Sequence, residues 1–138
     1  MAFWLLKSEP ETFSWDDQVA RGHGGEPWTG VRNHLAKNHL KSMTKGDQAF
    51  FYHTGKERQI VGIVEIASNP FADPTDTAWT AVTCVAHMQM THPVSLTQIK
   101  ADPLLAEMTL VTQPRLSVQP VSVAQWTHVS ALGVPRPI

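Results

Sequence analysis

The sequence predicts an α+β domain, most simply a small β-barrel surrounded by short helices. About five β-rich runs alternate with about four short segments that carry helix-start and helix-stop signals. The 138 residues have the length of one ordinary domain with a single core. No repeat, low-complexity segment or linker interrupts the chain, so residues 1–138 are expected to form one domain.

The N-terminal third is expected to hold one strand and two helices. Residues 2–7 are mostly apolar and predict a buried strand. Ser14, followed by acidic residues, predicts the start of a short helix that ends at Gly22. Residues 32–43 predict an amphipathic helix. Its inward side chains are expected to be Leu35, Leu40 and Met43.

The middle of the chain is β-rich. Residues 47–53 and 59–67 predict two strands, and the intervening residues 54–58 have the composition of a hairpin loop. Residues 78–88 predict a third long strand. The turn-rich residues 69–74 would return this strand to pair with the second.

The C-terminal part predicts three helices and one extended segment. A short helix is expected to begin at Ser95 or Thr97, and a second to run over residues 102–108. Residues 115–121 are expected to be extended. A final helix is expected over residues 123–132, with a serine cap before it and a glycine after it.

Composition excludes several classes of protein. With 42% hydrophobic and 17% charged residues the chain has a globular balance, and no run of about 18 apolar residues occurs that could span a membrane. The N-terminus has no basic region before its short apolar stretch, so it does not resemble a signal peptide. The lone Cys84 cannot form an intramolecular disulfide and is expected to be a buried small hydrophobe. These features predict an intracellular, reducing and cytoplasmic setting.

Positive charge is concentrated in two segments, although the net charge is only −1. Residues 31–58 carry six basic and two acidic residues, and residues 111–138 carry two basic residues and no acid. This distribution predicts a local anion site with a few phosphate contacts rather than a long nucleic-acid footprint. The alternative is a solvated helix face, since Lys37, Lys41 and Lys45 recur at intervals of four.

Catalytic and metal-binding patterns are weak. The seven His are scattered and no Cys-x-x-Cys occurs, so neither a metal nor another cofactor is expected. No Gly-x-Ser-x-Gly elbow or phosphate-cradling glycine loop occurs. The neighbouring carboxylates at residues 9 and 11 and at 16 and 17 lie near helix starts, where the helix dipole already favours acids.

Residues 28–33, Trp-Thr-Gly-Val-Arg-Asn, combine an aromatic ring with polar groups in a glycine-rich setting. Trp28 could lie at the surface and stack on an unpaired base. Arg32 offers a planar fork of donors for phosphate, and Asn33 has both the donor and the acceptor needed for a base edge. Alternatively, Trp28 packs under the loop and Arg32 and Asn33 cap the next helix. These six residues alone leave both interpretations open.

Further polar residues lie at the ends of expected strands. Lys7 and Ser8 end the first strand, and strand ends at a barrel rim commonly face a ligand. Alternation in the late extended segment places Arg115, Ser117 and Gln119 on one polar face. This face lies in the second positively charged segment.

Residues 50–53, Phe-Phe-Tyr-His, lie in the second expected strand. Alternation places Phe50 and Tyr52 on one face, and Phe51 and His53 on the other. One pair must face the core, and the sequence does not decide which.

Seven short motifs follow one another over nearly the whole chain. They are residues 3–10 (FWLLKSEP), 13–17 (FSWDD), 28–33 (WTGVRN), 45–47 (KGD), 51–53 (FYH), 61–65 (VGIVE) and 115–120 (RLSVQP). Together these motifs resemble the EVE domain. The resemblance implies a PUA-like mixed β pseudobarrel of about five to six strands surrounded by short helices. The EVE domain is related to the YTH domain, which holds a methylated adenine of RNA in an aromatic cage.

The resemblance also implies roles for individual residues. Trp28 resembles the cage tryptophan, and Ser8 resembles the serine that follows the first strand at the pocket. Arg32 and Asn33 would continue the rim, and the segment of Arg115, Ser117 and Gln119 would border the same cleft. The chain departs from the family pattern because no second cage tryptophan is identified. Tyr52 or Phe51 could supply that wall.

We therefore expect a nucleic-acid-binding module, and not an enzyme, that holds a modified base of DNA or RNA. The expected base-binding residues are Trp28, Ser8, Asn33, Phe51, Tyr52, His53 and Gln119. The expected phosphate-binding residues are Arg32, Arg115, Ser117 and Lys7. The alternatives are a PUA-like hydrolase of modified nucleosides that uses Lys7 or a carboxylate, and a protein-interaction module with an exposed apolar patch. The modification, DNA versus RNA, and the oligomeric state stay open, with a monomer the simplest expectation.

Overall fold

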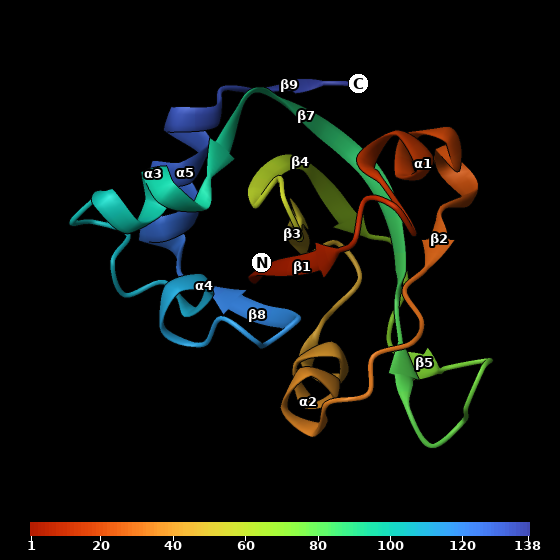
Figure 1. The fold of residues 1–138 in the computed structure, drawn as a ribbon. Coiled ribbons are helices and arrows are strands. Elements are labelled where there is room, and N and C mark those ends of the chain that lie inside the picture. Colours follow the sequence, from red (N-terminus) through yellow and green to blue (C-terminus); the bar gives the residue numbers. More distant parts are fainter.

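One curled sheet organises residues 1–138, all of which the computed structural model describes (Figure 1). Six strands follow in the order β2–β7–β4–β3–β1–β8, and β9 pairs with β7. Their bounds are β1 Phe3–Ser8, β2 Glu26–Pro27, β3 Gln48–His53, β4 Gln59–Ile66, β7 Thr83–Ser95, β8 Val118–Val121 and β9 Pro135–Pro137. A separate hairpin joins β5 (Phe71–Ala72) to β6 (Thr80–Ala81). The expected α+β pseudobarrel with short helices is confirmed.

Strand pairing explains the curl. β1 lies parallel to β3 and antiparallel to β8, while the expected β3–β4 hairpin and the β4–β7 pair are antiparallel. The register shifts between Phe51 and Tyr52 and at two places between β4 and β7. Such irregularities bend strands and increase their twist, so the sheet curves instead of staying flat.

Five α-helices and one 3₁₀ helix cover the sheet. They are α1 Trp15–Ala20, η1 Gly22–Gly24, α2 His34–Ser42, α3 Leu96–Ala101, α4 Thr109–Thr112 and α5 Val123–Gly133. Ser14 and Ser122 cap α1 and α5 in capping boxes, as their positions in the sequence predict. Figure 1 shows α1 and α2 on one side of the sheet and α3, α4 and α5 on the other. No helix is both long and apolar enough to cross a bilayer.

Several expected elements differ from the structure. The third long strand begins at Thr83 and continues to Ser95, because its far end pairs with the start of β4. The helix expected over residues 102–108 is a series of turns, in which Asp102 accepts a hydrogen bond from the Leu104 N–H. Leu35 is 44% exposed instead of inward, since α2 buries Ala36 and Leu40.

Two apolar clusters fill the two sides of the sheet, and β3 contributes to both. Phe51 belongs to the cluster beneath α1 and α2, whereas Phe50 and Tyr52 belong to the cluster beneath α3, α4 and α5. Both faces of β3 are therefore core. Cys84 is fully buried in the first cluster, as expected for a small hydrophobe, and burial raises the pKa of its thiol.

Candidate functional site

A cavity of about 730 Å³ lies where the end of β1, the loop before α1, β2 and the loop before α2 meet. We call it the Trp28 cavity. Its lining residues are Lys7, Ser8, Glu9, Thr12, Phe13, Arg21, Glu26, Pro27, Trp28, Thr29, Gly30, Val31, Arg32, Asn33 and Ser117. This volume lies in the usual range for small-molecule sites, about 300–1,000 Å³. Six of the eleven expected site residues contribute to the lining.

Trp28 is packed into the wall of the cavity and is not an exposed ring. Only 9% of the residue is exposed, and its ring meets those of Phe13 and Phe51 nearly perpendicularly, at 82° and 85°. The backbone N–H of Trp28 donates to the Val82 carbonyl at 2.7 Å, which fixes the loop against the sheet. The expectation that the indole is left uncovered at the surface is therefore wrong, although the residue does line the cavity. Most of the ring is packed, and a narrow surface faces the cavity.

A glycine makes this placement of the loop possible. Gly25 adopts a positive φ of 72°, and a Cβ there would stand 2.7 Å from the Cys84 carbonyl oxygen. A side chain would push β2 away from β7. Gly25 thus allows the close pairing that brings Trp28 into the wall.

Phe13 supplies a second aromatic ring, which the sequence interpretation missed. The side chain is half-buried, lines the Trp28 cavity and lies beneath the guanidinium of Arg21, 5.4 Å from the ring centroid. The Ser8 hydroxyl donates to the Phe13 carbonyl and so holds this residue beside the end of β1. The available signal was the position of Phe13 directly before the helix cap at Ser14.

Lys7 is a cation in the cavity wall that no carboxylate neutralises within ion-pair distance. Its Nζ donates to the Pro114 carbonyl at 2.6 Å, and its backbone N–H donates to the Ser117 carbonyl at 3.0 Å. Partial burial of its ammonium group lowers the pKa of Lys7. The end of β1 and the segment before β8 thus meet at the cavity, as the polar residues of both strands predict.

Arg32 lines the cavity, but its charge is compensated. Its Nη1 lies 3.1 Å from a carboxylate oxygen of Asp73, whose side chain is completely buried. The same oxygen accepts the Gly30 N–H at 2.9 Å. Burial alone would raise the pKa of Asp73, but hydrogen bonds from Thr75, Gly30 and Arg32 outweigh it and hold that pKa well below its ordinary value. Arg32 therefore braces the loop instead of pointing freely at a phosphate.

Asn33 caps α2. Its Oδ1 accepts the Ala36 N–H at 2.9 Å, so the capping interpretation is confirmed for this oxygen. The amide nitrogen makes no hydrogen bond within the protein and stays available at the cavity. Asn33 also lines a neighbouring hollow together with Arg115, which is exposed and does not reach the Trp28 cavity.

Four expected base-binding residues do not line the cavity. Phe51 lies fully buried behind Trp28 and Phe13, and Tyr52 faces the opposite cluster. His53 Nε2 accepts the Trp15 N–H, and its Nδ1 pairs with Glu57. These residues lie in a strand that is core on both faces, which the alternation pattern alone could not reveal.

Gln119 is also buried, and its Nε2 donates to the Leu116 carbonyl at 2.8 Å. It therefore stabilises the turn before β8 and does not face a ligand. Ser117, two residues earlier, is the member of this segment that reaches the Trp28 cavity.

Comparison with known proteins places the chain in a family. The family model of the EVE domain matches residues 2–132, so the chain belongs to the EVE domain family. Among its relatives, thymocyte nuclear protein 1 of mouse is 32% identical, and the match covers 98% of this chain and 75% of the mouse protein. The chicken protein of the same name is 34% identical, with 97% and 69% covered.

Solved structures agree with this assignment. A protein from Agrobacterium tumefaciens superposes with a TM-score of 0.94 at 45% identity, covering 96% of this chain and 93% of that one. Human THYN1, in a complex with DNA containing 5-methylcytosine, superposes with a TM-score of 0.90 at 29% identity, covering 99% and 100%. An ASCH protein from Zymomonas mobilis, 12% identical with a TM-score of 0.61, shares the fold alone.

Proposed function

We propose that this protein binds nucleic acid and holds one extruded, modified base in the Trp28 cavity. The observation that carries the proposal is the cavity itself, in which two aromatic side chains, Trp28 and Phe13, stand beside polar groups from β1 and the loop before α2. The DNA complex of human THYN1, whose modified base is 5-methylcytosine, supports the same class of ligand. Membership of the EVE family agrees with it.

The aromatic wall supplies the contact with the flat face of the base. Stacking a base on an aromatic side chain contributes about 1–3 kcal/mol. Extraction of the base from a duplex costs a few kcal/mol, so modest affinity is expected for duplex targets and tighter binding where the base is already unpaired. The apolar surface of the two rings favours a base that carries an added methyl group.

The polar groups would orient the base and its phosphate. The Asn33 amide N–H groups can donate to a base carbonyl or ring nitrogen, since Oδ1 is committed to the helix cap. Lys7 offers a positive charge that no protein carboxylate neutralises, which suits a phosphate or a carbonyl oxygen. Ser117 lines the same wall and can donate or accept.

The proposal is tested by measuring affinities for matched oligonucleotides. Fluorescence anisotropy would compare strands with one unmodified or one modified base, as DNA and as RNA, and as single strands and duplexes, at two ionic strengths. We expect at least one modified strand to bind more tightly than its unmodified counterpart. Equal affinity for all modified and unmodified strands would contradict the proposal.

A hydrolase acting on modified nucleosides is the second candidate. The observation that favours it is Lys7, because a lysine with a lowered pKa in a cavity can serve as a general base. Incubation with modified nucleosides, followed by chromatography, distinguishes the two functions. Turnover that Lys7→Met abolishes would support the hydrolase, and unchanged nucleosides would support binding alone.

A further inference from the structure

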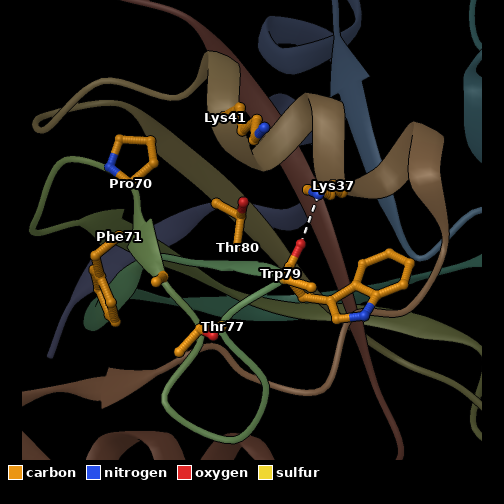
Figure 2. A pocket seen from close by; sticks show the side chains of 9 residues that line it. Lys37, Lys41, Pro70, Phe71, Thr77, Trp79 and Thr80 are labelled. Carbon is orange, nitrogen blue, oxygen red and sulfur yellow. Dashed lines mark hydrogen bonds between the residues drawn. The ribbon is translucent and has the colours of Figure 1, made fainter.

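A second hollow, of about 350 Å³, lies between α2 and the β5–β6 hairpin (Figure 2). We call it the Lys37 hollow. Lys37 and Lys41 enter it from α2, and Phe71 and Trp79 enter it from the hairpin and the residue before β6. No acidic residue lines it. Its lining is therefore cationic and aromatic, a combination suited to a nucleotide.

The two lysine charges are free of carboxylate partners. Lys37 Nζ donates to the Ala78 carbonyl at 2.6 Å and stands 5.4 Å from the centroid of the Trp79 ring. Neither Lys37 nor Lys41 has a carboxylate within ion-pair distance. Because residues four apart share one helix face, α2 presents both charges to the same hollow.

The acidic residues of the hairpin loop have other roles. Asp73 pairs with Arg32. Asp76 Oδ1 accepts the Ala78 N–H at 3.1 Å, which closes the turn before Trp79. The charge of the Lys37 hollow is thus left for an anion from outside the protein.

The two depressions are neighbours. Arg32 lines the Trp28 cavity, and its guanidinium carbon lies 5.6 Å from the centroid of Trp79, which borders the Lys37 hollow. The contact between Arg32 and Trp79 therefore links the two depressions. This adjacency would let a nucleic-acid strand with its extruded base in the cavity reach the Lys37 hollow with a neighbouring nucleotide.

We propose that the Lys37 hollow is a subsite for the nucleotide next to the extruded base. Its phosphate would lie between Lys37 and Lys41, and Phe71, which is 36% exposed, would offer its ring to the neighbouring base. This inference rests on the proposed function of the Trp28 cavity, and it assigns the position of the flanking strand.

The first experiment measures the salt dependence of binding. The double variant Lys37→Gln/Lys41→Gln and the matched control Lys56→Gln/Lys100→Gln lose the same charge, but the control lysines lie outside both depressions. For the Lys37→Gln/Lys41→Gln variant and a single-stranded ligand, we expect a shallower slope of log K against log[salt]. The change should be about 0.7 for each phosphate contact that is lost. The control should keep the wild-type slope. Both variants should keep the ratio of affinities for modified and unmodified strands.

The second experiment varies the length of the ligand. Phe71→Ala should weaken binding of a modified trinucleotide by about fivefold or more, which corresponds to about 1 kcal/mol of stacking. It should leave the affinity for the modified mononucleotide unchanged. Leu104→Ala removes an apolar side chain elsewhere that is even more exposed, at 71%, and serves as the control.

The outcomes separate the two proposals. If the wild-type protein binds no modified strand selectively, both the proposed function and this subsite are overturned. If it binds selectively, but the Lys37/Lys41 variant has the slope of its control and Phe71→Ala behaves like Leu104→Ala, the subsite alone is overturned.

Discussion

The two sides of the sheet use aromatic residues in opposite ways. Beneath α3, α4 and α5, Trp126 stacks nearly parallel on Phe50 and Phe3, with ring centroids 3.9 and 4.3 Å apart. Beneath α1 and α2, Trp28 and Trp15 meet Phe51 edge-on. Both geometries are favourable for aromatic pairs, but only on the second side does one of the rings, that of Trp28, belong to a residue that lines the Trp28 cavity.

The two sides of the sheet also differ in their buried polar residues. His53 and Gln18 form hydrogen bonds from within the side that carries the cavity, and Asp73 is buried under its loop. On the side of Trp126, the buried polar residue is Gln119, which pairs with Leu5 of that cluster. The side that carries the cavity therefore holds more of the buried polar groups, and their hydrogen bonds fix the loops around the cavity.

The largest expected effects are on stability, and they should be similar on the two sides. Trp28→Ala and Trp126→Ala each remove a large ring from a residue that is only 9% or 8% exposed. We expect each to lower the free energy of unfolding by about 3–5 kcal/mol. Urea denaturation followed by circular dichroism measures this. If Trp28→Ala left the free energy unchanged, Trp28 would not belong to the core and the comparison would fail.

A smaller effect should locate the acid sensitivity of the protein on the cavity side. The pKa of Asp73 is lowered in the folded state, so its ionised form stabilises the fold above the unfolded-state pKa of about 3.9. That contribution is lost as the pH falls below about 4 towards the lower folded-state pKa. Asp73→Asn should destabilise the protein by about 1–3 kcal/mol at pH 7 and flatten the pH dependence below pH 4.

Asp102, which pairs with His128 near α5, provides the matched control. Asp102→Asn should change stability less than Asp73→Asn, since Asp102 is accessible to solvent. Thermal unfolding at pH values from 2 to 7 compares the two variants. An equal loss of stability at both positions would show that acid sensitivity is not specific to the cavity side.

A conservative substitution separates binding from stability. Trp28→Phe keeps an apolar ring in the wall but reduces the surface for stacking, so affinity for the modified strand should fall about tenfold, or about 1.4 kcal/mol. Trp126→Phe should leave this affinity unchanged, because no part of its cluster reaches the cavity. Isothermal titration calorimetry on both variants, at a temperature where each is folded, provides the test. Equal losses of affinity would place the binding site elsewhere.

Local signals predicted much of the fold. The caps at Ser14 and Ser122 and the β3–β4 hairpin depend on residues close in sequence, and all three are present. The short strands β2 and β9 were not predicted, because their two or three residues include proline and they are defined by pairing with β7. Such elements depend on a distant partner and leave little trace in local composition.

The site was predictable in position more than in detail. The pattern of residues 28–33 and the polar end of the first strand indicate Trp28 and Ser8, and both line the cavity. The extent of burial of Trp28 depends on Phe51, 23 positions later, and the compensation of Arg32 depends on Asp73, 41 positions later. Sequence patterns within a few residues contain no information on such long-range contacts.

The smallest expected effect concerns the charge of Lys7. Lys7→Met keeps the length and the apolar stem of the side chain and removes only the charge, so affinity for the modified strand should fall only a few-fold. The difference between wild type and variant should also disappear at high pH, because burial lowers the pKa of Lys7 and it loses its charge at a lower pH than an exposed lysine. Lys100→Met, on α3, is the control and should bind like the wild type. Affinities measured from pH 7 to pH 10 would contradict the role of the charge if Lys7→Met and wild type differed equally at every pH.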